Sequence, residues 1–264
     1  MPIAGYILDL DGTVYVGERL VPGADRAIAA LRARGRRILF LSNKPLYSRR
    51  DYAQKLSCLG IPTCEEDVIN SSFVLARYLA RHAPAARVFA IGEPPLLAEL
   101  AAVGLHLTDD PAEVEYVIAA FDRTLDYRKL TIAFQALRRG ARFLATNPDR
   151  TCPVEGGEVP DAAGVIAFLE ATSGRAVEEV FGKPSRHTAE MALATLGLPA
   201  AQCALVGDRL ETDIRMAKEN GLVAILTLTG VTRRGDLARA SLQPDHVVDG
   251  IGDLPRLDRE LNTR

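Results

Sequence analysis

The chain has 264 residues, and its 32 Lys and Arg nearly balance its 34 Asp and Glu, for a formal net charge of −2. This balance gives no reason to expect a nucleic-acid polymer or a membrane surface as a partner. No apolar run approaches the roughly 20 residues that cross a bilayer, and the N-terminus lacks the basic start and long apolar centre of a secretion signal. The four cysteines are scattered and form no C-x-x-C pair, which favours free thiols in a reducing compartment. We therefore expect a cytoplasmic protein.

Strand-like apolar runs alternate with helical patterns along the chain, and this alternation predicts an α/β fold with a parallel sheet wrapped by helices. In the expected helices, apolar residues recur at helical spacing and a glycine often marks the end. The first series consists of strands at 5–10 and 36–43 and of helices at 23–35, 48–60 and 71–82.

A second series of the same kind begins after residue 86. It consists of strands at 87–92, 115–121 and 141–147 and of helices at 94–104, 127–140 and 165–174. The stretch 148–164 is punctuated by prolines and glycines and is expected to be a loop. The last part of the chain returns to the pattern of the first series, with helices at 187–197 and 211–221 and strands at 203–208 and 222–230.

Four polar clusters lie at the ends of strands or in the turns between elements, where ligands gather in an α/β chain. The first runs from Asp9 to Thr13, and on an extended backbone Asp9 and Asp11 point to the same side. One aspartate would fit a turn or a helix cap, but two on one face fit that interpretation poorly. A calcium loop of the EF-hand type would need glycine at Val14 and glutamate at Leu20, so it fails.

The other three clusters are each open to a simpler interpretation when taken alone. They are Ser42 with Asn43, the turn 182–184 with Lys183, and Asp208 with Asp213. A hydroxyl and an amide at a strand end are often helix caps, and a single lysine in a turn is usually solvated. Asp213 would sit in the opening turns of a helix, where the helix dipole favours acidic residues. Asp208, behind a glycine at the end of a buried strand, is harder to explain in this way.

The electrostatic cost of bringing the aspartates together indicates a cation. If Asp9, Asp11 and Asp208 converge at about 6 Å, each pair costs about 3 kcal/mol at an effective dielectric near 20, and the three pairs cost on the order of 8 kcal/mol. This is comparable to the stability of a whole domain, and one lysine does not offset it. Carboxylates and a backbone carbonyl are hard oxygen donors, which suit Mg²⁺. The sequence therefore predicts a magnesium cofactor.

With a metal in place, the remaining groups fit phosphoryl transfer. One carboxylate of the Asp9 and Asp11 pair could attack phosphorus and form an aspartyl-phosphate. The other, if the neighbouring charge raises its pKa, could protonate the leaving alkoxide and later deprotonate water. Ser42, Lys183 and free backbone N–H groups could hold the transferring phosphoryl oxygens.

The ordered motifs DLDGT, LSN, GKP and GDRLETD resemble those of the haloacid dehalogenase superfamily of phosphohydrolases. The resemblance covers essentially the whole chain. It is nearest to the NagD-like, p-nitrophenylphosphatase-like members, given VPGA after the first motif and ATNPD before the third. It implies a Rossmann-like, doubly wound parallel-sheet core with an inserted α/β cap of the C2 type.

The resemblance also implies roles for the matching positions. Asp9 would be the nucleophile and Asp11 the general acid/base. The implied magnesium ligands are Asp9, Asp11 through its backbone carbonyl, Asp208, and Asp213 directly or through water. The implied phosphate-binding residues are Ser42 and Lys183, with Asn43 assisting.

The segment between Ser42 and Lys183 is too long for a strand connection, and relatives of this kind place the cap there. We assign the cap to 83–178 and the core to 1–82 and 179–264. The short segment between Asp11 and Ser42 leaves no room for the helical cap of the phosphoglucomutase-like branch. Two departures from the family pattern, Lys44-Pro45 and the stretch 159–164, concern substrate choice and remove no catalytic group.

One loop and several functional alternatives stay open at this point. The loop with Asn147, Asp149 and Arg150 is either a source of cap contacts to substrate or an ordinary turn with an Asx cap. The expected activity is Mg²⁺-dependent hydrolysis of small phosphomonoesters, such as sugar phosphates, nucleotides or p-nitrophenyl phosphate. The alternatives are a phosphotransferase to an acceptor other than water, a receiver-like phosphorylatable module, and an inactive scaffold. Because caps of such relatives often pair, the resemblance also implies a homodimer.

Overall fold

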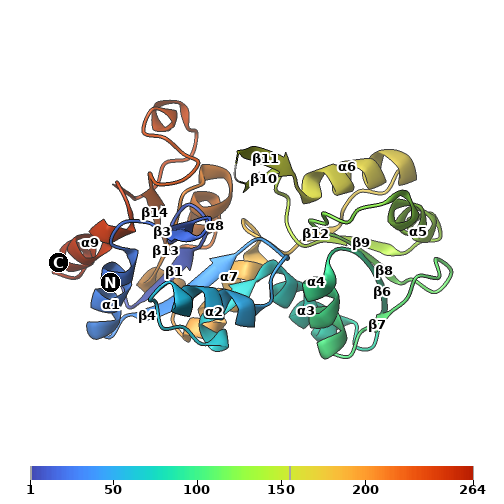
Figure 1. The fold of residues 1–264 in the computed structure, drawn as a ribbon, viewed down its shortest axis with the longest axis horizontal. Coiled ribbons are helices and arrows are strands. Elements are labelled where there is room, and N and C mark those ends of the chain that lie inside the picture. The colour runs from blue at the N-terminus through green and yellow to red at the C-terminus, as the bar shows by residue number, and fades with distance from the viewer. Residues whose placement is uncertain (1, 155, 264) are drawn as a thin grey trace. The chain divides into compact units, whose positions relative to one another are not determined.

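The computed structural model describes residues 2–154 and 156–263, which divide into two compact units. Unit 1 comprises Met1–Ser42, Arg49–Ile69 and Lys183–Arg264, and unit 2 comprises Asn43–Ser48 and Asn70–Gly182. None of the helices in these described residues has the length and apolar character to span a bilayer. Figure 1 follows the chain through both units by colour.

Unit 1 is built on a six-stranded sheet with the strand order β15-β14-β13-β1-β4-β5. The strands are β1 Gly5–Asp9, β4 Arg37–Ser42, β5 Val68–Asn70, β13 Cys203–Gly207, β14 Val223–Thr227 and β15 His246–Val248. The pairings of β1 with β4 and β13, and of β14 with β13 and β15, are all parallel. The carboxyl ends of β4, β1 and β13 therefore lie next to one another at one edge of the sheet, as expected for a doubly wound fold.

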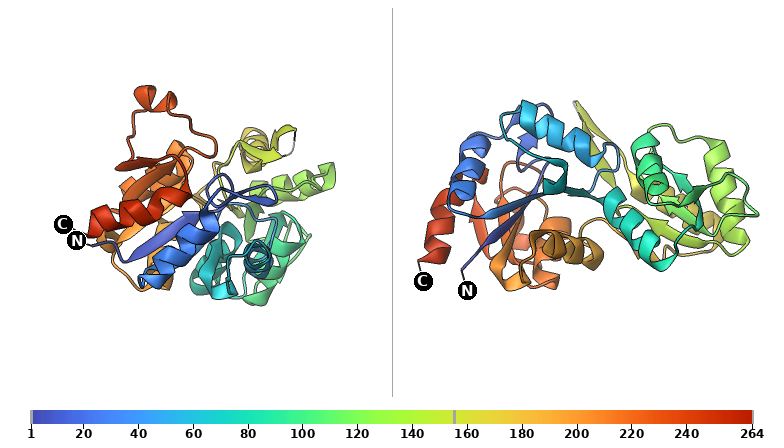
Figure 2. Two further views of the ribbon diagram at one scale, coloured as in Figure 1. Left: turned by 60° about the vertical axis from the view of Figure 1, so that its left-hand side comes forward. Right: turned by 90° about the horizontal axis from the view of Figure 1, so that it is seen from below.

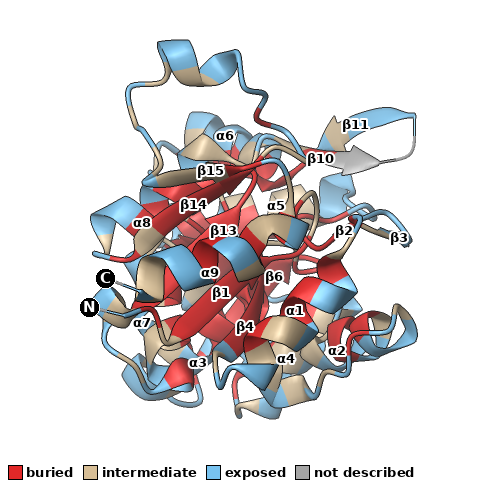
Figure 3. Ribbon diagram, turned by 90° about the vertical axis from the view of Figure 1, so that its left-hand side faces the viewer, coloured by how far each residue is buried: buried red, intermediate tan, exposed pale blue. Residues whose placement is uncertain are grey.

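The helices of unit 1 pack their apolar faces on this sheet. They are α1 Ala24–Ala33, α2 Arg49–Cys58, α7 Arg186–Leu196, α8 Arg215–Glu219 and α9 Leu254–Asn262. In α1, Ala27, Ile28 and Leu31 are buried at helical spacing, in line with the sequence pattern. α9 lies beside α1 in Figure 2, and the two helices are in contact. Figure 3 shows the central strands buried, with exposed residues on the outer faces of the helices.

Several elements of unit 1 differ from the sequence prediction. The expected helix at 211–221 begins with a π-helical turn, Leu210–Ile214, and becomes α-helical only in α8. The expected strand at 222–230 ends at Thr227, so the chain beyond it forms a loop. A hairpin of β2 Tyr15–Val16 and β3 Arg19–Leu20 was not predicted, because two-residue strands carry no readable periodicity. β5, β15 and α9 were also missed.

Unit 2 contains a separate five-stranded sheet with the order β12-β9-β8-β6-β7, in which every pairing is parallel. Its strands are β6 Arg87–Ile91, β7 His106–Leu107, β8 Tyr116–Ala119, β9 Arg142–Ala145 and β12 Glu179–Val180. Its helices are α3 Ser71–His82, α4 Pro94–Ala102, α5 Tyr127–Arg138 and α6 Ala162–Ser173. Side chains cap the starts of α3 and α5: Asn70 accepts the Phe73 N–H at 2.9 Å, and Asp126 accepts the Lys129 N–H at 2.7 Å.

The stretch 148–164, expected to be a loop, contains an antiparallel hairpin. Strand β10 Thr151–Val154 pairs with β11 Gly157–Pro160, and Thr151 lies opposite Pro160. Proline and glycine are tolerated in such edge ribbons, so their presence was a misleading loop signal here. α6 also begins at Ala162, three residues earlier than expected, because Asp161 accepts the Ala162 N–H at 2.5 Å.

The predicted fold class, α/β with a Rossmann-like parallel sheet, is confirmed. The range 83–178, which was assigned to a cap, lies within unit 2. Helix α3 was assigned to the core, but it belongs to unit 2 and contacts α4. That unit 2 acts as a cap stays a prediction.

Candidate active site

The end of β1 carries two of the predicted site residues. Asp9 is the last residue of the strand and is 6% exposed, while Asp11 is half-buried in the following turn and forms a β-bridge with Tyr15. The turn is closed by the Gly12 N–H, which donates to the Tyr15 carbonyl at 2.8 Å. Gly12 has φ +87°, and a Cβ there would lie 2.6 Å from Asp208 Oδ2. Both the backbone conformation and the space therefore require glycine at this position.

Three buried aspartates come together at the carboxyl edge of the sheet. Asp208 directly follows β13, and Asp213 lies on the π-helical turn. Each of Asp9, Asp208 and Asp213 offers a carboxylate oxygen, and these three oxygens all lie within 4.8 Å of one another. Asp213 packs directly on the end of β13, since a Cβ at Gly207 would lie 2.2 Å from its Cγ.

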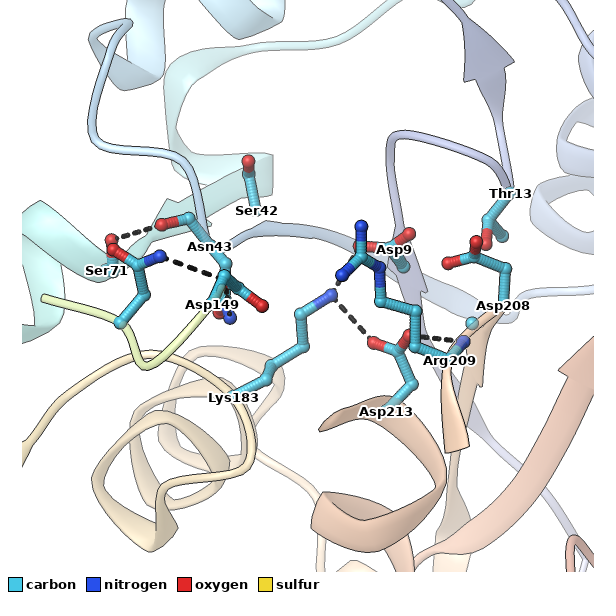
Figure 4. Close-up of polar contacts among 12 residues, drawn as sticks. Asp9, Thr13, Ser42, Asn43, Ser71, Asp149, Lys183, Asp208, Arg209 and Asp213 are labelled. Atoms are coloured by element: carbon cyan, nitrogen blue, oxygen red, sulfur yellow. Dashed lines mark hydrogen bonds and ion pairs between the residues drawn. The ribbon is translucent and has the colours of Figure 1, made fainter. Parts of the chain in front are cut away.

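Lys183 supplies a buried positive charge to this cluster. Its side chain is 4% exposed, and its Nζ forms an ion pair with Asp213 Oδ1 at 2.7 Å and another with Asp9 Oδ1. Figure 4 shows the ammonium beside both carboxylates. Burial alone would lower the pKa of Lys183, but the charges of Asp213 and Asp9 outweigh it and raise this pKa. The lysine is therefore held as a cation.

The cluster still has more acidic than basic groups. Burial raises the pKa of Asp9; the charge of Lys183 opposes this, and the charges of Asp213 and Asp208 add to it. Burial, followed by the charge of Asp213, raises the pKa of Asp208 to about 6. Three carboxylates face one buried ammonium, so an added cation would stabilise their ionised forms.

The donor atoms fit a divalent cation. Asp9 Oδ2 is buried and has no hydrogen-bond partner among the residues that the structure describes. A buried, unpaired carboxylate oxygen is costly unless something positive binds it. The oxygens that Asp9, Asp208 and Asp213 offer form the hard oxygen set that Mg²⁺ and related ions prefer.

A loop that the sequence analysis did not single out contacts Asp208. The Val231 N–H donates to Asp208 Oδ2 at 2.6 Å, and the Thr229 hydroxyl donates to the Gly12 carbonyl at 2.6 Å. A Cβ at Gly230 would lie 1.9 Å from Asp208 Oδ2, so the loop backbone touches the carboxylate. A backbone N–H leaves no side-chain signal, and only the Thr-Gly pair after the strand marked this turn.

Ser42 and Asn43, although adjacent in the chain, belong to different units. Ser42 ends β4 and is 3% exposed, and its hydroxyl donates to the Tyr52 hydroxyl at 3.0 Å. The register of β1 and β4, with Asp9 opposite Leu41, places Ser42 at the same edge of the sheet as Asp9. Asn43, in unit 2, accepts from the Ser71 hydroxyl at 2.6 Å through its carbonyl and donates from Nδ2 to Asp149 at 2.9 Å.

The loop after β9 forms a hydrogen-bonded network within unit 2. Asn147 Nδ2 donates to Asp149 and to Asp161, both at 2.9 Å. Asp149 therefore receives amide N–H groups from both Asn43 and Asn147 at the same oxygen. The Asn147 and Asp149 side chains thus hold the segment that begins at Asn43 to this loop, an arrangement that the turn pattern alone did not predict.

The comparisons with known proteins agree with this fold. The family model described as haloacid dehalogenase-like hydrolase matches residues 6–106, and a second model of haloacid dehalogenase hydrolase-like proteins matches 180–254. The sugar-phosphatase AraL of Bacillus subtilis is 40% identical over 97% of this chain and 94% of its own length.

Two solved structures align over nearly the whole chain. A 4-nitrophenylphosphatase from Thermotoga maritima is 35% identical with a TM-score of 0.92, covering 96% of this chain and 97% of that one. A glycerol phosphate phosphatase from Mycobacterium tuberculosis, solved in complex with magnesium, is 32% identical with a TM-score of 0.90, covering 99% and 79%.

The fold and the site thus define a class of α/β enzymes that carry carboxylates and a lysine at the carboxyl edge of the sheet. The chain belongs to the haloacid dehalogenase-like hydrolases. The resemblance to p-nitrophenylphosphatase-like members and the enzyme class, a phosphoric monoester hydrolase, are confirmed. Phosphatases of this family use a divalent metal.

Proposed function

We propose that the chain is a Mg²⁺-dependent phosphatase that hydrolyses small phosphomonoesters through an aspartyl-phosphate on Asp9. The observation that carries this proposal is the environment of the Asp9 carboxylate. One of its oxygens is paired with Lys183, and the other is buried without a partner among the described residues. A nucleophile needs such an oxygen, held in place and not engaged in a hydrogen bond.

Asp9, Asp208 and Asp213 are the side chains that would hold the metal, with the Asp11 carbonyl as a further ligand. At the 4.8 Å limit of their separation, each ionised pair costs about 3.5 kcal/mol at an effective dielectric near 20. A Mg²⁺ ion held by these residues would supply positive charge that offsets this repulsion and would neutralise phosphate oxygens. Its absence would leave Asp208 partly protonated near neutral pH, given its raised pKa of about 6.

In the first half of the reaction, an Asp9 carboxylate oxygen bonds to phosphorus as the bond from phosphorus to the ester oxygen breaks. Asp11 donates its proton to the leaving alkoxide. In the second half, Asp11 takes a proton from water, the water oxygen bonds to phosphorus, and the bond to Asp9 breaks to release phosphate. Asp9 and Asp11 are then in their starting forms.

The phosphoryl oxygens need donors during both steps. Lys183 provides a cation that is held beside Asp9, and Ser42 provides a hydroxyl at the same edge of the sheet. Asn43 is proposed as an assisting phosphate ligand because it directly follows Ser42 in the chain. Such preorganised donors neutralise charge where it develops in the transition state.

The proposed substrates are small phosphorylated metabolites, with p-nitrophenyl phosphate as a surrogate. The matched relatives are named for sugar phosphates, glycerol phosphate and 4-nitrophenyl phosphate, which share a phosphomonoester and differ in the group attached to it. We propose that unit 2 acts as the cap that selects this group and excludes water, and that the protein is a cytoplasmic homodimer.

The test is phosphate release from p-nitrophenyl phosphate and from a panel of sugar, glycerol and nucleoside monophosphates, with and without Mg²⁺. We expect many turnovers per protein chain with Mg²⁺ and none in excess EDTA. Release that stops after one equivalent would instead identify a receiver-like module. Added alcohols that accept the phosphoryl group in place of water would identify a phosphotransferase.

A further inference from the structure

Two buried hydroxyl groups meet at the end of β4. The Ser42 hydroxyl lies 3.0 Å from that of Tyr52, and the two residues are 3% and 2% exposed. Tyr52 lies on α2, ten residues further along the chain, and its ring belongs to the core of unit 1. A buried phenol usually finds a hydrogen-bond partner, and here that partner is a residue with a proposed role in phosphate binding.

We propose that Tyr52 is a positioning residue that fixes the Ser42 hydroxyl for phosphate binding, an inference that rests on the proposed function of Ser42. A serine side chain has three staggered rotamers, so its hydroxyl needs a partner to favour one of them. The Tyr52 ring is locked by packing, with Ala53 and Leu56 buried on the same side of α2. Its hydroxyl is therefore a rigid anchor at a defined place.

The hydrogen-bonding capacity of the two hydroxyls suits this task. A serine hydroxyl has one proton to donate and can accept two hydrogen bonds. When Ser42 donates that proton to a phosphate oxygen, its oxygen can accept from the Tyr52 hydroxyl. Hydrogen bonds linked in this way, from Tyr52 to Ser42 to phosphate, polarise one another.

α2 is also held in place without the Tyr52 hydroxyl. One turn further on, Lys55 donates to the Gly17 carbonyl at 2.8 Å and pairs with Glu18 at 2.9 Å. The Lys55 ammonium also lies 4.2 Å from the centroid of the Tyr15 ring. Removing only the hydroxyl of Tyr52 should therefore leave the helix where it is, so that a change in phosphate binding reports on the hydrogen bond itself.

The test is a double-mutant cycle of Tyr52→Phe and Ser42→Ala, read through inhibition by inorganic phosphate and through KM and kcat for p-nitrophenyl phosphate. We expect Tyr52→Phe to weaken phosphate inhibition about fivefold to tenfold, the effect of one lost hydrogen bond. In the Ser42→Ala background, the same change should have no further effect. Ser42→Thr keeps the hydroxyl and should remain sensitive to Tyr52→Phe.

The matched control is Tyr6→Phe. Tyr6 is also fully buried in unit 1, and its hydroxyl donates to Asp258 at 3.0 Å. This variant loses one phenolic hydrogen bond, as Tyr52→Phe does, but not at Ser42. It should lower the melting temperature and leave phosphate inhibition unchanged. Tyr52→Met, which fills irregular space with a flexible apolar chain, repeats the measurement if Tyr52→Phe does not fold.

The outcomes separate this inference from the proposed function. If Ser42→Ala leaves phosphate inhibition unchanged, Ser42 is not a phosphate ligand. Both the proposed role of Ser42 and the positioning role of Tyr52 are then overturned. If Ser42→Ala weakens inhibition but Tyr52→Phe has no effect, the positioning role alone is wrong. The positioning role is also wrong if Tyr52→Phe weakens phosphate inhibition equally in the presence and absence of the Ser42 hydroxyl.

Discussion

Replacing Gly230 by alanine tests whether Asp208 is placed by the loop that touches it. The added Cβ would lie 1.9 Å from Asp208 Oδ2 and 2.5 Å from its Cγ, whereas non-bonded atoms prefer about 3.5 Å or more. The carboxylate and the loop cannot both keep their positions. One must move, and the 2.6 Å hydrogen bond from the Val231 N–H to Asp208 is then strained or lost.

A lost hydrogen bond to a charged group costs about 1.5–3 kcal/mol. The groups that orient metal ligands typically contribute about 10-fold to 100-fold to metal affinity or activity. We therefore expect Gly230→Ala to raise the Mg²⁺ concentration for half-maximal phosphatase activity by about 10-fold to 100-fold. Calorimetric titration with Mg²⁺ should show the same loss of affinity without relying on turnover.

Gly235→Ala is the control, because it makes the same substitution in the same loop. Gly235 has φ −67°, and no heavy atom lies within 4 Å of the position its Cβ would take. This variant should bind Mg²⁺ as the wild type does. Equal Mg²⁺ affinity of Gly230→Ala and Gly235→Ala, with both proteins folded, would refute the placement of Asp208 by this loop.

Three further substitutions test the charges of the site. Asp9→Asn should stay folded, with a cooperative thermal unfolding transition, and retain less than about a hundredth of the wild-type rate, because an amide of the same shape is a poor nucleophile. A higher rate in a clean preparation argues against that role. Lys183→Ala should lose turnover and phosphate affinity, and it should lower the free energy of unfolding by about 3–5 kcal/mol because two buried carboxylates lose their partner. The pKa of Asp208, raised to about 6, lies above its value of about 3.9 in an unfolded chain. Between these values the unfolded chain holds fewer protons, so in EDTA the wild type should lose stability relative to Asp208→Asn as the pH rises from about 4 to about 6. Urea unfolding of the two proteins at several pH values measures this, and a difference independent of pH contradicts it.

The sequence predicted which segments meet at the site. The alternation of strands and helices and the positions of the strand ends are local patterns, so they can be read from the sequence. Asp9 and Asp208 each follow a run of buried apolar residues, and the parallel neighbours β1 and β13 bring these ends together. What the pattern did not contain was the order of the strands. That order depends on which helix faces pack on which side of the sheet, and this is settled by tertiary contacts between distant segments.

The groups that orient the site residues were harder to find than the site residues themselves. Tyr52 has the sequence signature of an ordinary buried residue on an amphipathic helix, and nothing local connects it with Ser42. Val231 acts through a backbone N–H, which every residue except proline has. The hairpin at 151–160 was hidden because its prolines and glycines read as a loop. In each case the missing information was a contact between segments that sequence spacing does not relate.

The glycines at the site show how the acidic cluster keeps its geometry. Positions for a Cβ at Gly12, Gly207 and Gly230 all fall within 2.6 Å of a side-chain atom of Asp208 or Asp213. Backbone therefore encloses these carboxylates directly, and it can donate N–H groups to them, as Val231 and Arg209 do. A carboxylate confined by backbone has little freedom to turn away from its neighbours and relieve their repulsion. The strain is relieved by protonation or by a cation, so the same packing that makes the metal-free site unfavourable is what preorganises it for a divalent ion.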